Sequence, residues 1–344
     1  MASIFNTFEK SVAKLLNELP PRARSIVKRR YGLGEPEPMT LEAIGGKEGI
    51  TRERVRQIES DAMKKLRKSE VYTTLATFAV AITNMVNRLG GLVSEEALLV
   101  APEFSAVKDK RSILFFLDLA SSVIRRKEDD AFYARWQTKE TPAGKIEAAL
   151  NVFTNQLAQS EETLKESELH EQLTVQLRKA GFENIQTPVL ASYIGISKVI
   201  GKNTFGEYGH MDSPFVRPRG MRESAYVALA RVGQPLHFRE IAQRIGEFSA
   251  RPVHTQTVHN ELIKDSRFVL VGRGLYALRD WGYEPGFIKD VLKRLLSERG
   301  AMTREAILAE VSKKRQVKPS TVLINLQNKK LFKSAGDGTY TLIS

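Results

Sequence analysis

Residues 40–59 constrain the fold of this chain most, because they encode two short helices separated by a glycine. In the second helix the apolar residues recur at helical spacing, at Val55, Ile58, Ala62 and Leu66. That spacing predicts one buried stripe along the helix. Thr40 and Thr51 stand where helix N-caps belong, and Gly49 lies in the turn. The segment therefore predicts a helix-turn-helix.

The polar side chains of the second helix point away from this stripe. Arg52, Arg56 and Gln57 share the outer face, and Glu53 in the first turn suits the positive end of the helix dipole. The N-terminal end of such a helix enters the DNA major groove. There Arg pairs with guanine and Gln with adenine, at ~1–3 kcal/mol for a good bidentate pair. These residues predict a DNA-reading face; the alternative is a merely solvated, charged helix face.

Several blocks in order carry a family resemblance. They are Leu19-Pro20-Pro21-Arg22, Arg29-Arg30-Tyr31-Gly32-Leu33, residues 40–45, residues 51–59 and Lys64-Lys65-Leu66-Arg67. Over roughly residues 10–70 they closely resemble region 4 of primary-type bacterial sigma factors. The resemblance implies that the domain reads the upstream promoter hexamer and docks on the flap of the RNA polymerase β subunit. It implies base and phosphate contacts for Arg52, Glu53, Arg56 and Gln57, and DNA-backbone contacts for Arg30 and Thr40.

One position departs from that family. A large apolar residue usually precedes the turn glycine, whereas this chain has Glu48. Together with Gly46, this departure predicts a loosened second helix.

The charge of the chain is distributed unevenly. The 344 residues carry a net charge of +13, which favours an anionic partner. Lys and Arg number 15 against 10 Asp and Glu in residues 1–70, 15 against 17 in residues 71–210, and 23 against 13 in residues 211–344. We therefore expect nucleic-acid contact at the two ends, and a spacer or protein-binding surface in the middle.

Residues 71–344 are predicted to repeat one unit, in which a helix, a short strand, two helices and a hairpin follow one another. An aromatic residue marks the end of each copy, at Tyr133, Tyr208, Tyr276 and Tyr340. The expected fold is mainly α with small β-wings, an N-terminal helix-turn-helix domain followed by tandem winged-helix domains. The expected domains are 1–70, 71–140, 145–210, 221–283 and 284–344, with linkers at Thr141–Gly144 and Gly209–Gly220.

The copy at 221–283 also resembles a known module. Met221-Arg222-Glu223-Ser224-Ala225 and the stretch from Gly233 to Ala242 are similar to the HARE-HTH family. This winged-helix module occurs in the delta subunit of bacterial RNA polymerase and in chromatin and DNA-modifying proteins. The resemblance implies association with DNA or polymerase rather than catalysis.

Further DNA contacts are predicted in these copies. Arg273 stands between two glycines at a predicted wing tip, where it can reach a phosphate or a minor groove. Gln256, His259 and Asn260 lie on a predicted recognition helix. Lys313, Lys314, Arg315 and Lys318 form a basic run before the last one. The alternatives are a solvated surface and, for some copies, protein docking.

Catalytic patterns are missing from the sequence. There are no cysteines, and the five histidines lack zinc-ligand spacing. Neither Gly-x-Gly-x-x-Gly nor Gly-x-Ser-x-Gly occurs. We expect no enzyme activity, no cofactor and no metal. The N-terminus lacks a signal-peptide pattern, and no run of eighteen apolar residues exists. These features predict a cytoplasmic, nucleoid-associated protein without a membrane segment.

The sequence thus predicts a bacterial DNA-binding protein of transcription initiation, with double-stranded promoter-type DNA and the RNA polymerase core as partners. It is not expected to be a complete sigma factor, because region 4 comes first and no aromatic-rich promoter-melting helix follows. The alternative is a delta-like accessory protein that docks on polymerase and binds DNA nonspecifically. A third hypothesis is a DNA-organising or defence protein. The oligomeric state stays open.

Overall fold

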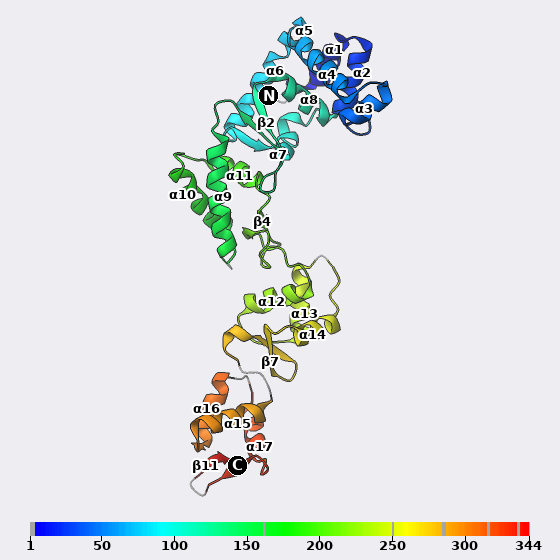
Figure 1. Cartoon of the computed structure of the whole chain (residues 1–344). Coiled ribbons are helices and arrows are strands. Elements are labelled where there is room, and N and C mark those ends of the chain that lie inside the picture. Colours follow the sequence, from blue (N-terminus) through cyan, green and yellow to red (C-terminus); the bar gives the residue numbers. More distant parts are fainter. Residues whose placement is uncertain are drawn as a thin grey trace. The chain divides into compact units, whose positions relative to one another are not determined.

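The computed structural model describes residues 4–160, 162–249, 251–283, 287–314, 317–335 and 338–343. The chain is mainly helical with small antiparallel sheets (Figure 1), as the sequence predicted. Its contacts divide it into two compact units. The N-terminal unit comprises Met1–Gly201 and Tyr208–Met211, and the C-terminal unit comprises Lys202–Glu207 and Asp212–Ser344.

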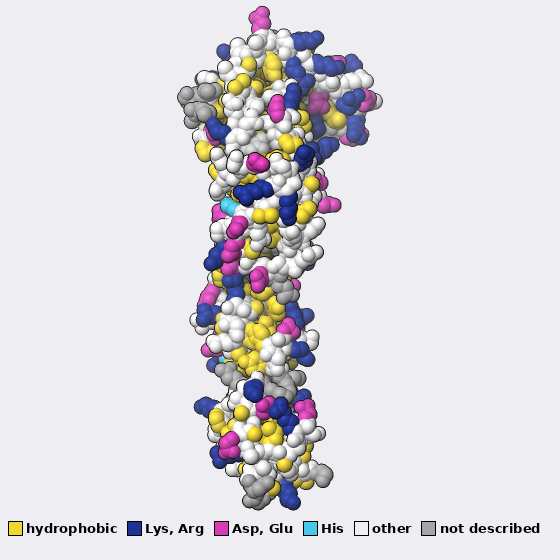
Figure 2. Space-filling view, turned by 90° about the vertical axis from the view of Figure 1, so that its left-hand side faces the viewer, with side chains coloured by type: hydrophobic (Ala, Val, Ile, Leu, Met, Phe, Trp, Pro, Cys, Tyr) yellow, Lys and Arg dark blue, Asp and Glu magenta, His cyan; other side chains and the backbone are white. Residues whose placement is uncertain are grey.

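The N-terminal unit opens with a helical segment. Its elements are η1 (Ile4–Thr7), α1 (Phe8–Asn17), α2 (Pro21–Tyr31), α3 (Leu41–Glu48), α4 (Arg52–Arg67) and α5 (Glu70–Thr74). Figure 2 shows several Lys and Arg side chains around this part of the chain, with acidic side chains among them.

A mixed helical and stranded segment follows. It contains α6 (Ala76–Arg88), β1 (Leu92–Ser94), α7 (Glu95–Leu99), η2 (Pro102–Phe104), α8 (Lys110–Ala120), β2 (Val123–Arg126) and β3 (Arg135–Thr138). The strand β3 lies between β1 and β2 and is antiparallel to both, with Trp136 opposite Val93 on one side and Arg125 on the other.

These first two segments share one hydrophobic core. Phe8 of α1 is fully buried, and its ring lies 5.2 Å from that of Phe78 of α6 and 5.4 Å from that of Phe116 of α8. The same core includes Leu66 of α4 and Trp136 of β3. Since apolar burial supplies most of the folding free energy, the helices of residues 8–67 are stabilised by residues that follow them in the chain.

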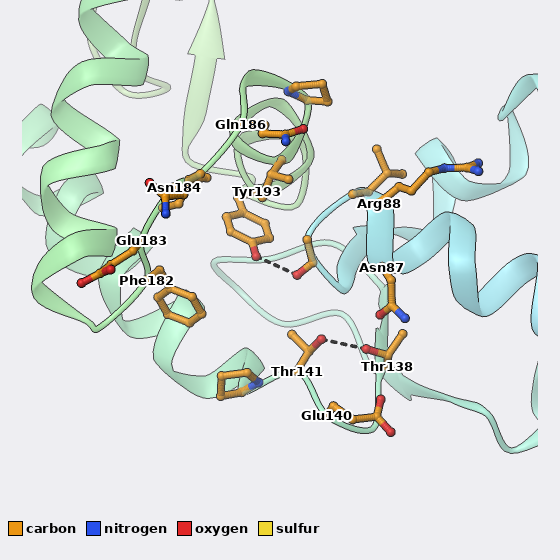
Figure 3. A pocket seen from close by; sticks show the side chains of 16 residues that line it. Asn87, Arg88, Thr138, Glu140, Thr141, Phe182, Glu183, Asn184, Gln186 and Tyr193 are labelled. Atoms are coloured by element: carbon orange, nitrogen blue, oxygen red, sulfur yellow. Dashed lines mark hydrogen bonds between the residues drawn. The ribbon is translucent and has the colours of Figure 1, made fainter.

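A third segment completes the N-terminal unit, although Lys202 at the end of its first strand is assigned to the C-terminal unit. It contains α9 (Ala143–Gln159), α10 (Glu166–Lys179), α11 (Thr187–Gly195), β4 (Ile200–Lys202) and β5 (Tyr208–His210). Thr141–Gly144, which the sequence predicted to be a linker, is instead a tight turn, because the hydroxyls of Thr138 and Thr141 lie 2.8 Å apart and α9 already begins at Ala143. The hydroxyl of Tyr193 in α11 donates to the Gly90 carbonyl at 2.7 Å, beside a cleft (Figure 3).

The C-terminal unit contains two segments with separate cores. The first has α12 (Met221–Val232), β6 (Leu236–His237), α13 (Phe238–Phe248), α14 (Thr255–Lys264), β7 (Phe268–Gly272), β8 (Leu275–Leu278) and η3 (Arg279–Trp281). The second has α15 (Ile288–Arg299), β9 (Met302–Thr303), α16 (Arg304–Lys314), α17 (Pro319–Leu326), β10 (Phe332–Ser334) and β11 (Thr339–Leu342).

One element order recurs along the chain. Starting from α6, α12 and α15, a helix is followed by a strand, two principal helices and two further strands. In each case the last strand, β3, β8 or β11, lies in the middle of a three-stranded sheet. In the segment that begins with α9, the first strand is reduced to a single bridge between Leu164 and Tyr208. This repeated order positions α8, α14 and α17 alike, ahead of a β-hairpin.

Candidate nucleic-acid interface

The helices α3 and α4 meet across a tight turn whose caps match the sequence prediction. The hydroxyl oxygen of Thr40 accepts the N–H of Ala43 at 3.1 Å, and that of Thr51 accepts the N–H of Arg54 at 3.2 Å. Between the helices Gly49 adopts φ +64°, a left-handed conformation that favours glycine. The two caps fix where α4 begins and so where its N-terminal side chains lie.

A small core orients these helices against α2. Ile26 of α2, Ile44 of α3 and Val55 of α4 are fully buried, and Ile50 and Ile58 pack against them. The predicted stripe of α4 is confirmed, because Val55, Ala62 and Leu66 are buried and Ile58 is partly buried. The opposite face of α4 is thereby left at the surface.

The second helix of the pair, which the sequence predicted to be loosened, runs without interruption as α4 from Arg52 to Arg67. The helix α3 continues to Glu48, whose carboxylate lies 2.6 Å from the Arg29 guanidinium and 3.6 Å from that of Arg22. The Glu48 side chain is only 18% exposed. Two arginines of α2 therefore hold the carboxylate in place, and the ion pairs take the role of an apolar contact.

The predicted DNA-reading residues Arg52, Glu53, Arg56 and Gln57 are all exposed at the N-terminal end of α4. Arg56 donates from Nε and Nη2 to the Glu53 carboxylate, at 2.9 and 2.6 Å. Arg54, which the sequence analysis did not single out, donates to the side-chain oxygen of Gln57 at 3.2 Å. The i,i+3 spacing of both pairs could have indicated these contacts.

The Glu53–Arg56 pair is ionised and oriented. Hydrogen bonds from Arg56 lower the pKa of the Glu53 carboxyl, and Glu53 in turn raises the pKa of Arg56. Only Nε and Nη2 of Arg56 bond to the described part of the chain. The end of the guanidinium that carries Nη1 is therefore open to an outside acceptor. Such a fixed planar fork suits bidentate recognition.

Arg30 and Thr40, the two predicted DNA-backbone contacts, already have contacts within the chain. Arg30 donates to the Met39 carbonyl at 3.2 Å and lies 3.6 Å from the Glu59 carboxylate. Burial raises the pKa of Glu59, and Arg30 opposes that rise. Thr40 remains exposed although its oxygen caps α3.

The C-terminal end of α4 is held by α8. Arg67 donates to the Leu119 and Asp118 carbonyls at 2.9 and 3.0 Å. From α8, Arg111 donates to the carbonyls of Gly32 and Glu35, at 3.2 and 2.7 Å, within the loop after α2. The four predicted reading residues at the N-terminal end of α4 therefore stay exposed.

In the C-terminal unit, two of the predicted contacts share one face of α14. Gln256 donates to the Asn260 side chain at 3.0 Å, and both residues are exposed. His259 is partly buried and stacks on Phe238 at 4.4 Å, so its ring has an internal partner. Arg273 is exposed in the turn between β7 and β8, as predicted.

The predicted basic run in the last segment is only partly described. Lys313 is exposed and pairs with Glu310 at 2.8 Å. The Lys314 side chain and Arg315 lie outside the described residues. Sequence reasoning missed Lys329, Lys330 and Lys333, which are exposed around the start of β10 and form no ion pair with the described residues. A charge count for this segment alone would have indicated them.

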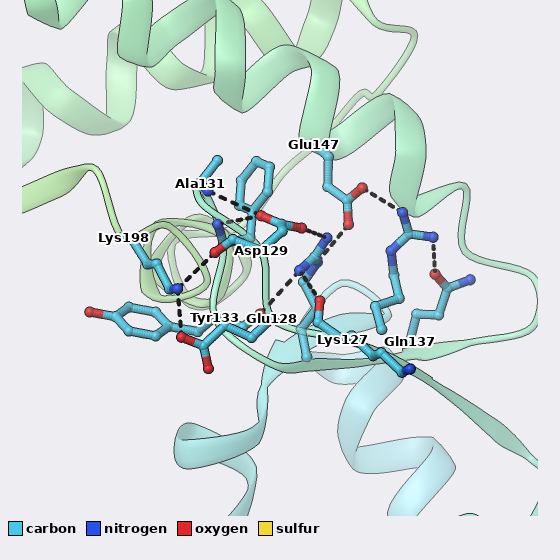
Figure 4. A network of polar contacts seen from close by, with 11 residues as sticks. Lys127, Glu128, Asp129, Ala131, Tyr133, Gln137, Glu147 and Lys198 are labelled. Carbon is cyan, nitrogen blue, oxygen red and sulfur yellow. Dashed lines mark hydrogen bonds and ion pairs between the residues drawn. The ribbon is translucent and has the colours of Figure 1, made fainter.

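The loop of the hairpin between β2 and β3 is held by contacts within the protein (Figure 4). Its loop contains Glu128 and Asp129, and Lys198 lies 2.7 Å from the Asp129 carbonyl. Arg135, only 3% exposed, lies 2.6 Å from the Glu147 carboxylate and 3.0 Å from that of Asp129. This acidic loop is fixed onto the following segment and is not available as a basic wing.

The described part of the chain lacks two other features. Within it, no group of His, Cys, Asp and Glu side chains could hold a metal ion. None of its helices combines the length and apolar character needed to cross a membrane.

The N-terminal segment is similar to known proteins. Residues 15–68 match the family Sigma-70, region 4. RNA polymerase sigma factor SigA of Clostridium acetobutylicum is 41% identical over 66 residues, which are 19% of this chain and 18% of that protein. The SigA proteins of a Nostoc species and of Microcystis aeruginosa are 45% and 44% identical over 62 residues, or 18% of this chain and 16% and 15% of theirs. The chain thus matches less than a fifth of these relatives.

Proposed function

We propose that this chain is a sigma-like DNA-binding protein of bacterial transcription initiation, and that residues 15–68 recognise promoter-type DNA. The observation that carries the proposal is the exposed N-terminal end of α4, with Arg52, Glu53, Arg56 and Gln57 at the surface of a segment that matches Sigma-70, region 4. These four exposed side chains are not part of the buried stripe that stabilises α4, which lies on the opposite face of the helix.

The geometry of this face supports the proposed recognition. With the N-terminal end of α4 in the major groove, Arg56 presents its free guanidinium end to guanine O6 and N7. Glu53 holds that guanidinium in place, which reduces the side-chain entropy lost on binding. Gln57 suits adenine, and Arg52 is placed for a base or a phosphate. Arg30 and Thr40 border the face and are proposed to contact the DNA backbone.

The repeated element order in residues 71–343 supports tandem winged-helix segments, the third of them HARE-HTH-like. We propose the divisions 71–140, 145–210, 221–283 and 284–344 for them. Gln256, Asn260, Arg273, Lys313 and Lys314 then extend the DNA contact. The acidic loop after β2 is bound to the following segment of the chain instead, so it is not proposed to contact DNA.

A delta-like accessory role is the second candidate. The exposed lysines Lys329, Lys330 and Lys333 favour it, because they suit phosphates of any sequence rather than base edges. In that case the chain docks on RNA polymerase, through the β flap or another surface, and binds DNA nonspecifically. In either role the protein is proposed to act without catalysis of its own.

DNA binding by the full chain tests the first proposal. Fluorescence anisotropy would compare a duplex carrying the upstream hexamer of SigA promoters with a scrambled duplex, across a range of salt concentrations. We expect preference for the hexamer duplex, and expect Arg56→Ala and Gln57→Ala each to remove about 1–3 kcal/mol of it. Lys65→Ala, an exposed change farther along α4, serves as the matched control.

Substitution of two exposed lysines should affect both duplexes equally, unlike substitution of Arg56 or Gln57. The change Lys329→Ala with Lys330→Ala should weaken both duplexes alike and lower the salt slope by about one per lysine. If the unmodified chain binds both duplexes equally with one salt slope, specific recognition is refuted. Capture of purified RNA polymerase core by that chain at low salt then decides whether the delta-like role holds.

A further inference from the structure

We propose that the cleft between α6 and α11 binds an extended peptide of a protein partner, one in which an apolar side chain is flanked by Lys or Arg. This cleft lies within the N-terminal unit and has a volume of about 1010 Å³. It is formed by the end of α6, the turn before α9 and the stretch from Phe182 into α11 (Figure 3). The proposal does not depend on DNA recognition.

Part of the cleft lining is apolar. Leu89, Phe182, Ile185 and Val189 line it and are each partly exposed, although they are large apolar residues. Concave apolar surface of this kind, bordered by polar groups, is typical of binding sites. An inserted apolar side chain would bury surface that the folded chain leaves open to water.

The walls of the cleft are fixed before any ligand binds. Tyr193 donates to the Gly90 carbonyl at 2.7 Å, and Ser192 donates to the Leu92 carbonyl at 2.8 Å. A Cβ atom at Gly91, where φ is +77°, would lie 1.8 Å from the Thr141 hydroxyl oxygen, so the two walls are packed closely at this point. A preformed cleft loses little conformational entropy on binding.

The rim suits a peptide backbone. Asn87 lies on one wall, and Asn184 and Gln186 lie on the other (Figure 3). All three are exposed, and their amide groups form no hydrogen bond with the described part of the chain. Each amide carries both a donor and an acceptor. They therefore complement the alternating N–H and C=O groups of an extended chain.

The charges of the rim select a basic ligand. Glu140 and Glu183 are exposed at opposite walls and form no ion pair with the described residues. Arg88, the cation among the lining residues, lies 2.7 Å from the Glu103 carboxylate. Unpaired carboxylates repel phosphate, which argues against nucleic acid here, and attract Lys or Arg. Of the three ranges 1–70, 71–210 and 211–344, only residues 71–210, which include the cleft, have more acidic than basic side chains.

A selection experiment on the full chain tests this inference. A phage library of random twelve-residue peptides would be selected on the immobilised protein, with the charge-reversed variant E140K/E183K used to remove cleft-independent binders. We expect enrichment of an apolar residue flanked by Lys or Arg. Absence of any enriched motif that depends on the cleft, or enrichment of acidic peptides, would overturn the proposal.

Affinities of the selected peptide provide the quantitative check. E140K/E183K should weaken binding by about tenfold or more, as expected for two lost ion pairs replaced by repulsion. The matched reversal E162K/E171K, at exposed positions outside the cleft, should leave the affinity within twofold. Thermal melting would verify that both variants fold.

Two competitors distinguish other occupants. If tetralysine without an apolar residue binds as tightly as the selected peptide, charge alone accounts for binding and the peptide cleft is refuted. If duplex DNA displaces the selected peptide, the cleft is a nucleic-acid site and the proposal also fails. The expected result is that neither competes at concentrations where the unlabelled peptide does.

Discussion

Truncation of Phe8 should destabilise the helix-turn-helix segment and the following segment together. The Phe8 side chain is fully buried between rings of α6 and α8, 5.2 and 5.4 Å away. Phe8→Ala removes that ring from a shared core, and such truncations lower the free energy of unfolding by about 3–5 kcal/mol. The loss should therefore be sensed far along the chain, at Trp136 of β3, which belongs to the same core.

Urea unfolding followed by tryptophan fluorescence can measure this coupling. The chain has two tryptophans, so a Trp281→Phe background leaves Trp136 as the single reporter of the N-terminal unit. With a urea dependence of about 3 kcal/mol per molar for a unit of this size, Phe8→Ala should lower the Trp136 midpoint by roughly 1–1.7 M. Val80→Ala is the control, because Val80 is 58% exposed on α6 and should change stability by less than about 0.5 kcal/mol.

An unchanged Trp136 midpoint in Phe8→Ala would refute the coupling. The helices before α6 would then unfold independently of Trp136. Part of the far-ultraviolet circular dichroism signal would be lost at a lower urea concentration than the Trp136 transition. In that case residues 1–70 could be studied as an isolated DNA-binding domain. The shared core argues against doing so, since a truncated fragment would expose the apolar side chains of α1 and α4 to water.

Two further predictions concern the N-terminal unit. Gly91→Ala should lower the stability of this unit by at least about 2 kcal/mol in urea titrations, because φ is +77° and the new Cβ would lie 1.8 Å from the Thr141 hydroxyl. The control is Gly34→Ala, where φ is +72° but the space around the residue is open, so that only the cost of the left-handed backbone should be lost. Equal losses of stability in the two variants would contradict the packing argument. Burial raises the pKa of Asp118, so the folded state retains a proton that the unfolded state has released. The unfolding free energy should therefore fall as pH rises from the unfolded pKa of about 3.9 through the higher folded value. Asp118→Asn should lessen that fall but not remove it, because burial also raises the pKa of Glu59. An unchanged slope in the variant would exclude Asp118 as a source.

Local signals along the chain predicted the helix-turn-helix correctly. The caps Thr40 and Thr51, the turn at Gly49 and the stripe of α4 all depend on residues three or four positions apart. Such contacts form within one helix or one turn, so the sequence is enough to specify them. The exposure of the predicted reading residues follows from the same periodicity, since a helix has only one buried face.

The sequence did not predict the ion pairs that charged side chains form with residues on other helices. Glu48 was expected to loosen the second helix of the pair, but Arg29 and Arg22 of α2 neutralise it. Arg30 was expected to face DNA, and it also bonds to Glu59 and to the Met39 carbonyl. No spacing rule indicates these pairs, because they depend on the angle at which α2 packs against α3 and α4.

By itself the sequence determined the exposed polar face of α4, the order of helices and strands and the basic character of both ends, because these depend on local propensity and composition. Only the tertiary structure decided that α1 and α4 share a core with α6 and α8, that the acidic loop after β2 is pinned by Lys198, and that a cleft opens beside Tyr193. Each of these joins residues distant in sequence, and their contacts arise only when whole helices pack against one another.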